Sequence, residues 1–338
     1  MSIGIIAFSE KGMRLGERIQ AYYAAKQSSA SLVRCECDGL SQWTNEHFSI
    51  DEALIFIGSC GIAVRAVAPF IKSKTGDPAV VVIDELATYA VSLLSGHLGG
   101  ANELATELSG LTGALPVVTT ATDRNGVFSI DAWAKKQGLT IANPERIKSI
   151  AVRLLAGEQV GLKSHFPVEG RLPEGISLSS GEYHVLVTYK TNGKADALRL
   201  IPRVITLGIG CKKGTDAVTI ENAFALTLAK AGCHPAAVAR VCSVDMKANE
   251  PGILEFCVNH DLPYQTFSAK ELQRVKGTFT SSAFVQSVAG VGNVCERSAV
   301  LGSGENGRLI SGKDAGFGVT MALAAAPYTV RFPEGEEI

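Results

Sequence analysis

Short, continuously apolar runs mark the first part of the chain, and they alternate with amphipathic segments. Residues 3–8, 53–57 and 80–83 are almost entirely apolar, which is typical of strands buried on both faces of a sheet. Between the first two runs, Leu15, Ile19 and Tyr22 recur at the spacing of one helix face. Buried strands that alternate with helices predict a mostly parallel sheet with helices on each side.

The same alternation begins again at Val204, after a less regular stretch with a Gly/Pro/Ser-rich segment over 157–181. A chain of 338 residues also exceeds what one core usually serves. We therefore predict an α/β protein with two mostly parallel-sheet α/β domains joined by a smaller middle region. The expected boundaries are 1–125 for the N-terminal domain, 126–203 for the middle module or linker, and 204–338 for the C-terminal domain.

Composition excludes several classes of protein. Apolar residues make up 46% of the chain, which argues against disorder, and 32 basic residues balance 33 acidic ones without a basic run. We therefore expect neither a nucleic-acid partner nor a membrane partner. The eight cysteines include no Cys-x-x-Cys pair, and Cys35 and Cys37 are one residue apart, so free thiols in the cytoplasm fit better than disulfides or a zinc site. The first residues do not resemble a secretory signal.

A glycine-rich segment lies between an expected strand over 204–207 and an expected helix over 215–231. Its candidate ligand-binding residues are Gly208, Gly210, Lys212, Lys213, Gly214 and Thr215. Glycines allow a tight turn with free N–H groups, and a helix start favours an anion, with Thr215 either capping the helix or contacting the ligand. The spacing fits neither a Walker A loop nor the dinucleotide fingerprint. A structural turn with solvated lysines explains the segment equally well.

A second turn places a histidine between glycines, just before an expected helix that Asn102 caps and Gly113 ends. His97 is suited to proton transfer near neutral pH, and the N–H groups of Gly99 and Gly100 can stabilise an oxyanion. Asp84 and Glu85, at the end of an expected strand, can orient His97 or act as bases. The alternative is that His97 merely caps a neighbouring loop.

A third turn also joins a strand to a helix. Here Gly58, Ser59 and Gly61 can hold a carboxylate through the Ser59 hydroxyl and backbone N–H groups, with Arg65 one turn further on. Two weaker candidates, over 249–252 and 291–296, are explained equally well as helix starts.

Taken in order, these segments resemble the cobalt-precorrin-5A hydrolase family of anaerobic cobalamin biosynthesis. The resemblance rests on residues 58–65, 84–85, 95–102, 119–123, 207–215, 247–252 and 292–296, and it spans nearly the whole chain. It implies an enzyme that opens the ring-A lactone of cobalt-precorrin-5A and releases acetaldehyde to give cobalt-precorrin-5B. The family commonly has an arginine where this chain has Lys212 or Lys213, which makes bidentate carboxylate recognition there less certain.

On that resemblance, His97 is the expected general base for water attack on the lactone, assisted by Glu85 or Asp84. Backbone N–H groups near Gly99 and Gly100 stabilise the oxyanion, Asn102 is expected to contact the substrate, and the acid arms of the tetrapyrrole meet Arg65, Lys212, Lys213 and the helix starts. Cobalt enters with the substrate, so we expect no cofactor and no metal site in the protein.

Two alternatives remain open at this point. A non-catalytic carrier of tetrapyrrole intermediates would need the same glycine-rich turns, and a nucleotide-dependent enzyme is possible on a similar fold. The sequence gives no indication of oligomeric state.

Overall fold

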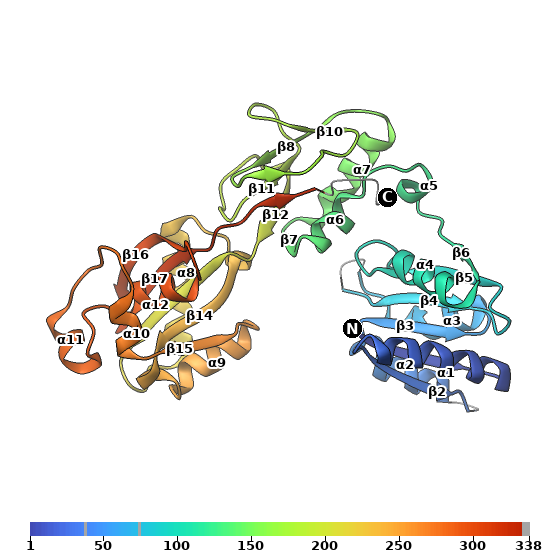
Figure 1. Ribbon diagram of the computed structural model, residues 1–338, viewed down its shortest axis with the longest axis horizontal. Helices are drawn as coiled ribbons and strands as arrows, with labels where there is room; N and C mark the ends of the chain where they lie inside the picture. The colour runs from blue at the N-terminus through green and yellow to red at the C-terminus, as the bar shows by residue number, and fades with distance from the viewer. Residues whose placement is uncertain (37–38, 74–75, 333–338) are drawn as a thin grey trace. The chain divides into compact units, whose positions relative to one another are not determined.

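The computed structural model of the chain describes residues 1–36, 39–73 and 76–332 (Figure 1). These residues form two compact units, one of Met1–Lys135 with Ile147–Glu158, the other of Lys136–Arg146 with the described residues from Gln159 onward. The three-domain division expected from the sequence stays a prediction. Cys37 and the last six residues of the expected C-terminal domain lie outside the described residues.

The first unit is built on a six-stranded sheet with the order β2-β1-β3-β4-β5-β6. Its strands are β1 (Ser2–Ala7), β2 (Ser29–Arg34), β3 (Ala53–Ile57), β4 (Ala79–Ile83), β5 (Tyr89–Leu94) and β6 (Leu115–Val117). All neighbours are parallel except β4 and β5, which pair antiparallel with Ile83 opposite Ala90. The link between β4 and β5 is too short to hold a crossover helix, so β5 must run back along β4.

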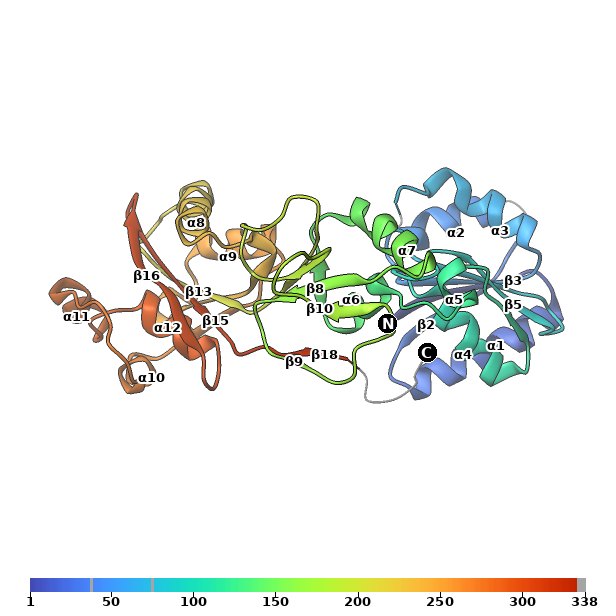
Figure 2. The ribbon, with the colours of Figure 1, turned by 90° about the horizontal axis from the view of Figure 1, so that it is seen from above.

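Helices cover both faces of this sheet, as the buried strands require (Figure 2). One face packs against α1 (Glu10–Ala25) and α4 (Ala101–Thr112), through buried residues such as Ile19 and Leu108. The other face packs against α2 (Gly39–Phe48) and α3 (Cys60–Val67), with Trp43 and Val67 in the core. Three further helices complete the unit: α5 (Ala121–Arg124), α6 (Ile130–Lys136) and α7 (Ile147–Leu155).

The expected irregular middle forms a sheet of its own, with the order β10-β8-β11-β12-β7. Its strands are β7 (Leu139–Ile141), β8 (Val160–Ser164), β10 (Ile176–Leu178), β11 (Val185–Val187) and β12 (Leu198–Pro202). A separate parallel pair joins β9 (Val168–Glu169), which follows β8 in the chain, to β18 (Val330–Arg331), the last strand of the described residues. The sequence did not reveal the strands over 160–178, because β10 has only three residues and β8, with the sequence VGLKS, has no continuous apolar run.

A second α/β sheet carries the C-terminal part, with the order β15-β14-β13-β17-β16. Its strands are β13 (Ile205–Cys211), β14 (Val238–Val244), β15 (Tyr264–Phe267), β16 (Arg308–Gly316) and β17 (Val319–Ala325). Strands β13, β14 and β15 run parallel, whereas β17 pairs antiparallel with both β13 and β16. Its helices are α8 (Ala217–Ala231), α9 (Pro251–Asn259), α10 (Ala269–Arg274), α11 (Ala283–Ala289) and α12 (Cys295–Gly302). Figure 2 shows α8 and α9 on one face of this sheet and α12 on the other.

The predicted mixed α/β class with mostly parallel sheets is confirmed. Six cysteines in the described part of the chain are free thiols, namely Cys60, Cys211, Cys233, Cys242, Cys257 and Cys295. Across the described residues, every helix is too short or too polar to pass through a bilayer.

Candidate active site

The loop between β5 and α4 holds His97 in a strained turn. Ser95 adopts a left-handed conformation with φ 57°, which is costly for a residue other than glycine and is often found at functional sites. Gly99 packs directly on Ser95, where an added Cβ would lie 2.2 Å from the Ser95 Cβ. Gly100, with φ 92°, is the residue that caps α4, so the prediction that Asn102 is the cap was wrong.

His97 lies between two carboxylates. Its Nε2 atom is 2.6 Å from Oδ2 of Asp123 and 3.0 Å from Oγ1 of Thr122, while Nδ1 is 3.6 Å from Oδ2 of Asp131. The side chain of Asp131 is 11% exposed and accepts a hydrogen bond from Ser129, whereas that of Asp123 is 39% exposed. The buried carboxylate holds the imidazole, and the exposed one faces solvent.

This arrangement keeps a proton on the imidazole. The carboxylate of Asp131 raises the pKa of His97 to about 9, against the effect of burial, and the hydrogen bond with Asp123 adds to the rise. Burial opposes ionisation of Asp131, yet the neighbouring imidazole of His97 and the hydrogen bond from Ser129 lower its pKa below the ordinary value. At neutral pH, His97 is therefore an imidazolium with a carboxylate on each side.

Asn102 orients the exposed carboxylate. Its side chain is buried, donates from Nδ2 to Asp123 Oδ2 and to Thr120 Oγ1 at 3.0 Å each, and accepts from Ser92 at 2.6 Å. The amide is fully occupied by these partners. The predicted contact of Asn102 with the substrate stays a prediction, and within the protein its side chain positions Asp123.

Asp84 and Glu85 do not approach His97. Asp84 accepts hydrogen bonds from the backbone N–H groups of Leu86, Thr88 and Tyr89, which order the β4–β5 turn and, against burial, lower its pKa. Glu85 accepts a hydrogen bond from Ser9. The predicted pairing of His97 with Asp84 or Glu85 was wrong, because β5 runs antiparallel and carries the chain to the other edge of the sheet. Its six residues span roughly 17 Å at about 3.4 Å per residue.

The third predicted turn lies at the same edge as Glu85, where β1, β3 and β4 end together. Gly58 donates to Ile83 O at 2.9 Å, Ser59 precedes α3 without capping it through its side chain, and Gly61 is in the first turn. Arg65 is exposed and forms no ion pair with any residue that the structure describes. Because α1 and α3 cover opposite faces, this edge is a topological switch point, where open α/β sheets commonly bind ligands.

In the second unit, the predicted glycine turn begins later than expected. Gly208 and Gly210 lie within β13 and pair with β17 on one side, so their assignment to a turn was wrong. An added Cβ at Gly208 would lie 1.8 Å from Cys295 O, which shows that this glycine lets α12 pack against the strand. Asp216 caps α8 through a hydrogen bond from Thr219 N, so the expected helix start at Thr215 was also wrong.

The actual turn consists of Lys212, Lys213, Gly214 and Thr215, at the carboxyl end of β13. Thr215 donates to Lys212 O at 2.8 Å, and Gly214, with φ 77°, donates its N–H to Glu250 Oε1 at 2.6 Å. The other oxygen of Glu250 binds Lys247 at 2.7 Å. Two segments of the resemblance therefore meet here, and Lys212 and Lys213 remain exposed.

A third segment of the resemblance, over 292–296, contains a buried carboxylate. Glu296 accepts from Thr280 N at 2.8 Å, Lys313 N at 2.7 Å and Asn293 Nδ2 at 2.9 Å. All three donors come from the protein itself, so Glu296 holds the loops around α12 together.

Sequence reasoning missed both partners of His97. Asp123 ends a segment that belongs to the resemblance, but it had no assigned role, and Asp131 is 34 residues from His97 with no motif around it. Within residues 1–36, 39–73 and 76–332, no group of three or more His, Cys, Asp or Glu side chains is arranged to hold a metal ion.

Three family models match the chain. They are "Cobalamin synthesis G N-terminal" over residues 42–123, "Cobalamin biosynthesis central region" over 128–202, and "Cobalamin synthesis G C-terminus" over 205–324.

Relatives in other organisms match over most of their length. The cobalt-precorrin-5A hydrolase of Salmonella typhimurium is 31% identical over 345 residues, covering 96% of this chain and 98% of that protein. The cobalt-precorrin-5A hydrolase of Priestia megaterium is 31% identical over 302 residues, covering 83% and 80%. A crystal structure of a cobalamin biosynthesis protein G homolog from Sulfolobus solfataricus is 25% identical, covers 96% of this chain and 97% of that one, and has a TM-score of 0.43.

Proposed function

The chain belongs to the cobalt-precorrin-5A hydrolase family, and we propose that it hydrolyses cobalt-precorrin-5A. In this reaction water opens the ring-A lactone, and the bridging carbon then leaves with its methyl group as acetaldehyde, giving cobalt-precorrin-5B. The cobalt belongs to the substrate, so the chain needs no cofactor of its own. A cytoplasmic address, with no nucleic-acid or membrane partner, remains our prediction.

The observation that carries the proposal is the position of the His97 imidazole between the carboxylates of Asp123 and Asp131. Hydrolysis of an ester needs a base for the attacking water and an acid for the departing alkoxide. With a pKa of about 9, His97 already holds its proton at neutral pH, so we assign it the acid and not the base expected from the sequence. Asp123, the exposed carboxylate, takes the proton from water.

In the second step, His97 acts as a base instead of an acid. Once His97 has protonated the ring-opened alkoxide, the neutral imidazole accepts the hydroxyl proton as the carbon–carbon bond breaks. Acetaldehyde leaves with its new carbonyl group, and the bonding electron pair passes to the conjugated macrocycle. Asp131 stays in contact with Nδ1 throughout and holds the ring in place.

Stabilisation of the oxyanion rests on Gly99. The N–H of Gly100 donates to His97 O at 3.0 Å within the turn, so the role predicted for Gly100 as a donor is not supported in this conformation. The N–H of Gly99 has no acceptor among the described residues, which leaves it available to the tetrahedral intermediate. One such donor contributes about 3 kcal/mol.

Cations supply contacts for the acid arms of the substrate. Lys135 Nζ lies 3.5 Å from Gly99 O, beside the proposed oxyanion donor. Arg65 with Ser59, and Lys212 with Lys213, stay our predicted arm-binding groups at the carboxyl ends of the two α/β sheets.

Incubation of the purified chain with cobalt-precorrin-5A tests the function directly. We expect mass spectrometry to show the ring-contracted product, and an alcohol dehydrogenase assay to detect one acetaldehyde per product. Binding with an unchanged ligand mass would establish the carrier alternative instead. A rise in melting temperature on addition of ATP or NAD(P) would favour the nucleotide-dependent alternative.

A further inference from the structure

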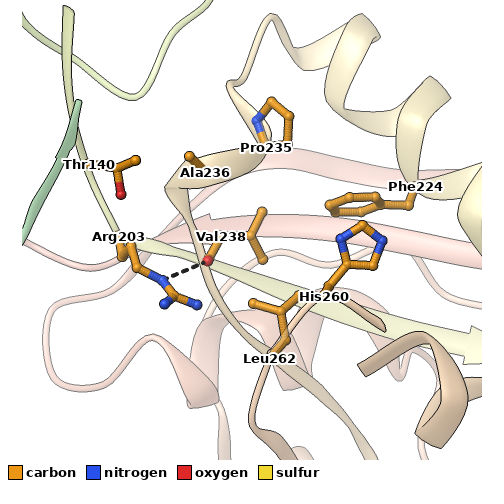
Figure 3. A pocket seen from close by; sticks show the side chains of 8 residues that line it. All are labelled: Thr140, Arg203, Phe224, Pro235, Ala236, Val238, His260 and Leu262. Carbon is orange, nitrogen blue, oxygen red and sulfur yellow. Dashed lines mark hydrogen bonds between the residues drawn. The ribbon is translucent and has the colours of Figure 1, made fainter. Parts of the chain in front are cut away.

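A cavity of about 270 Å³ lies in the second unit, at the edge of the C-terminal sheet where β14 begins (Figure 3). Its apolar walls come from Phe224, Pro235, Val238 and Leu262, and its polar side chains include Arg203 and His260. This edge is opposite the one that carries Lys212 and Lys213, because β13 and β14 are parallel and the cavity lies before both strands. The cavity therefore belongs to none of the sites described above.

Arg203 presents a fixed positive charge to the cavity. Its Nε donates to Val238 O at 3.3 Å, and Nη2 donates to Asp261 O at 3.5 Å. Both acceptors are neutral carbonyls, and no carboxylate of the described residues forms an ion pair with this guanidinium. The remaining N–H groups can bind a planar anion.

His260 stands across the cavity from Arg203 and is also held in place. Its Nε2 is 2.5 Å from Oε2 of Glu221, and its ring centroid is 4.6 Å from that of Phe256 and 5.3 Å from that of Phe224. Figure 3 shows the imidazole next to the ring of Phe224, with the guanidinium of Arg203 on the other side of Val238. A charged group and an apolar wall thus face one small space.

We propose that this cavity binds a small carboxylate with a short apolar body. The guanidinium recognises the carboxylate, and the walls around Phe224 and Leu262 take up the apolar part. The volume is just below the roughly 300–1,000 Å³ of sites for drug-sized ligands, so a whole tetrapyrrole does not fit. The carboxylate comes either from a free organic acid or from one acid arm of a larger molecule.

Benzoate binding to the full chain, measured by calorimetry, tests the site, with benzamide as the neutral probe. We expect benzoate to bind at least about tenfold more tightly than benzamide, and Arg203→Gln to abolish that preference. Arg240→Gln is the matched control, because Arg240 is exposed on β14 and outside the cavity lining, and it should change benzoate affinity less than about twofold. Ala236→Leu, which fills the cavity but keeps the charge, should also weaken binding of benzoate.

Equal affinity for benzoate and benzamide, or unchanged benzoate binding in Arg203→Gln with a normal melting temperature, would overturn the proposal. Inhibition kinetics identify the source of the carboxylate. Competition between benzoate and cobalt-precorrin-5A supports a site for an acid arm, and binding of benzoate without an effect on KM supports a site for a free acid. The calorimetric result does not depend on turnover, so it stands even if the proposed hydrolysis fails.

Discussion

Two glycine-rich segments, 95–100 and 208–215, look alike in sequence and differ in structure. In the first, glycines pack against Ser95 and cap α4, and the turn presents His97 to two carboxylates. In the second, Gly208 and Gly210 are strand residues, Gly208 makes room for α12, and only the last four residues turn. Whether a glycine belongs to a turn or to a close packing contact therefore depends on the helix or strand that lies against it.

The largest effect should come from His97. Removal of the proton donor in His97→Gln should lower kcat about 10²–10⁴-fold in the acetaldehyde assay. Loss of the contacts with Asp123 and Asp131 should also lower the melting temperature, so turnover is compared at a temperature at which the variant is folded. His47→Gln is the matched control, because His47 also binds an aspartate, Asp51 at 2.5 Å, but outside this site. Near-normal turnover in His97→Gln would show that the turn at 95–100 does not hold the proton donor of the reaction.

Substitution of Gly208 should mainly lower the stability of the fold, whereas substitution of His97 mainly lowers turnover. The Cβ of Gly208→Ala would meet backbone atoms of α12, so we expect the free energy of unfolding to fall by about 3 kcal/mol. Gly110→Ala is the control, because Gly110 lies in α4 with open space around it, and it should stabilise the chain by about 0.5–1 kcal/mol. Urea denaturation measures both. Full stability in Gly208→Ala would indicate that α12 does not pack as described.

A substitution at Glu250 tests the contacts that hold the turn at 212–215. The hydrogen bond from Lys247 lowers the pKa of Glu250, aided by the N–H of Gly214, so its stabilisation is present above the ordinary pKa and is lost as the pH falls through the lowered value. Glu250→Gln should cost about 2 kcal/mol at pH 7 and less in acid. A loss that does not change with pH would contradict the ion pair.

Asp131 should give the smallest effect, visible in the pH dependence of stability. The raised pKa of His97 stabilises the fold fully below about pH 6.5, and this contribution is lost as the pH rises through about 9. In Asp131→Asn the pKa falls towards its ordinary value, so the loss of stability between pH 6.5 and 9.5 should shrink by about 1 kcal/mol. Asp196→Asn, which alters an exposed carboxylate elsewhere, should leave the pH dependence unchanged.

The sequence predicted what local patterns determine. Continuous apolar runs located β1, β3 and β4, and Gly113 was correctly identified as the end of α4. These features depend on residues a few positions apart, so periodicity and capping preferences reveal them.

The site depended on contacts that local patterns do not contain. The antiparallel direction of β5 separated Glu85 from His97, although twelve residues of sequence suggested proximity. Asp131 reaches His97 from a helix that follows an irregular segment, and nothing at Asp131 distinguishes it from a surface carboxylate. The role of Gly208 depends on its contact with α12, which lies more than eighty residues further along the chain.

An NMR titration of the histidine ring nitrogens in the full chain tests the carboxylate–imidazolium–carboxylate arrangement most directly, with His97→Gln used to assign the resonance. We predict that His97 titrates with a pKa of about 9 and is protonated at pH 7. A value near 6.5, the ordinary pKa of histidine, would contradict the proton-donor role from which the proposed reaction starts.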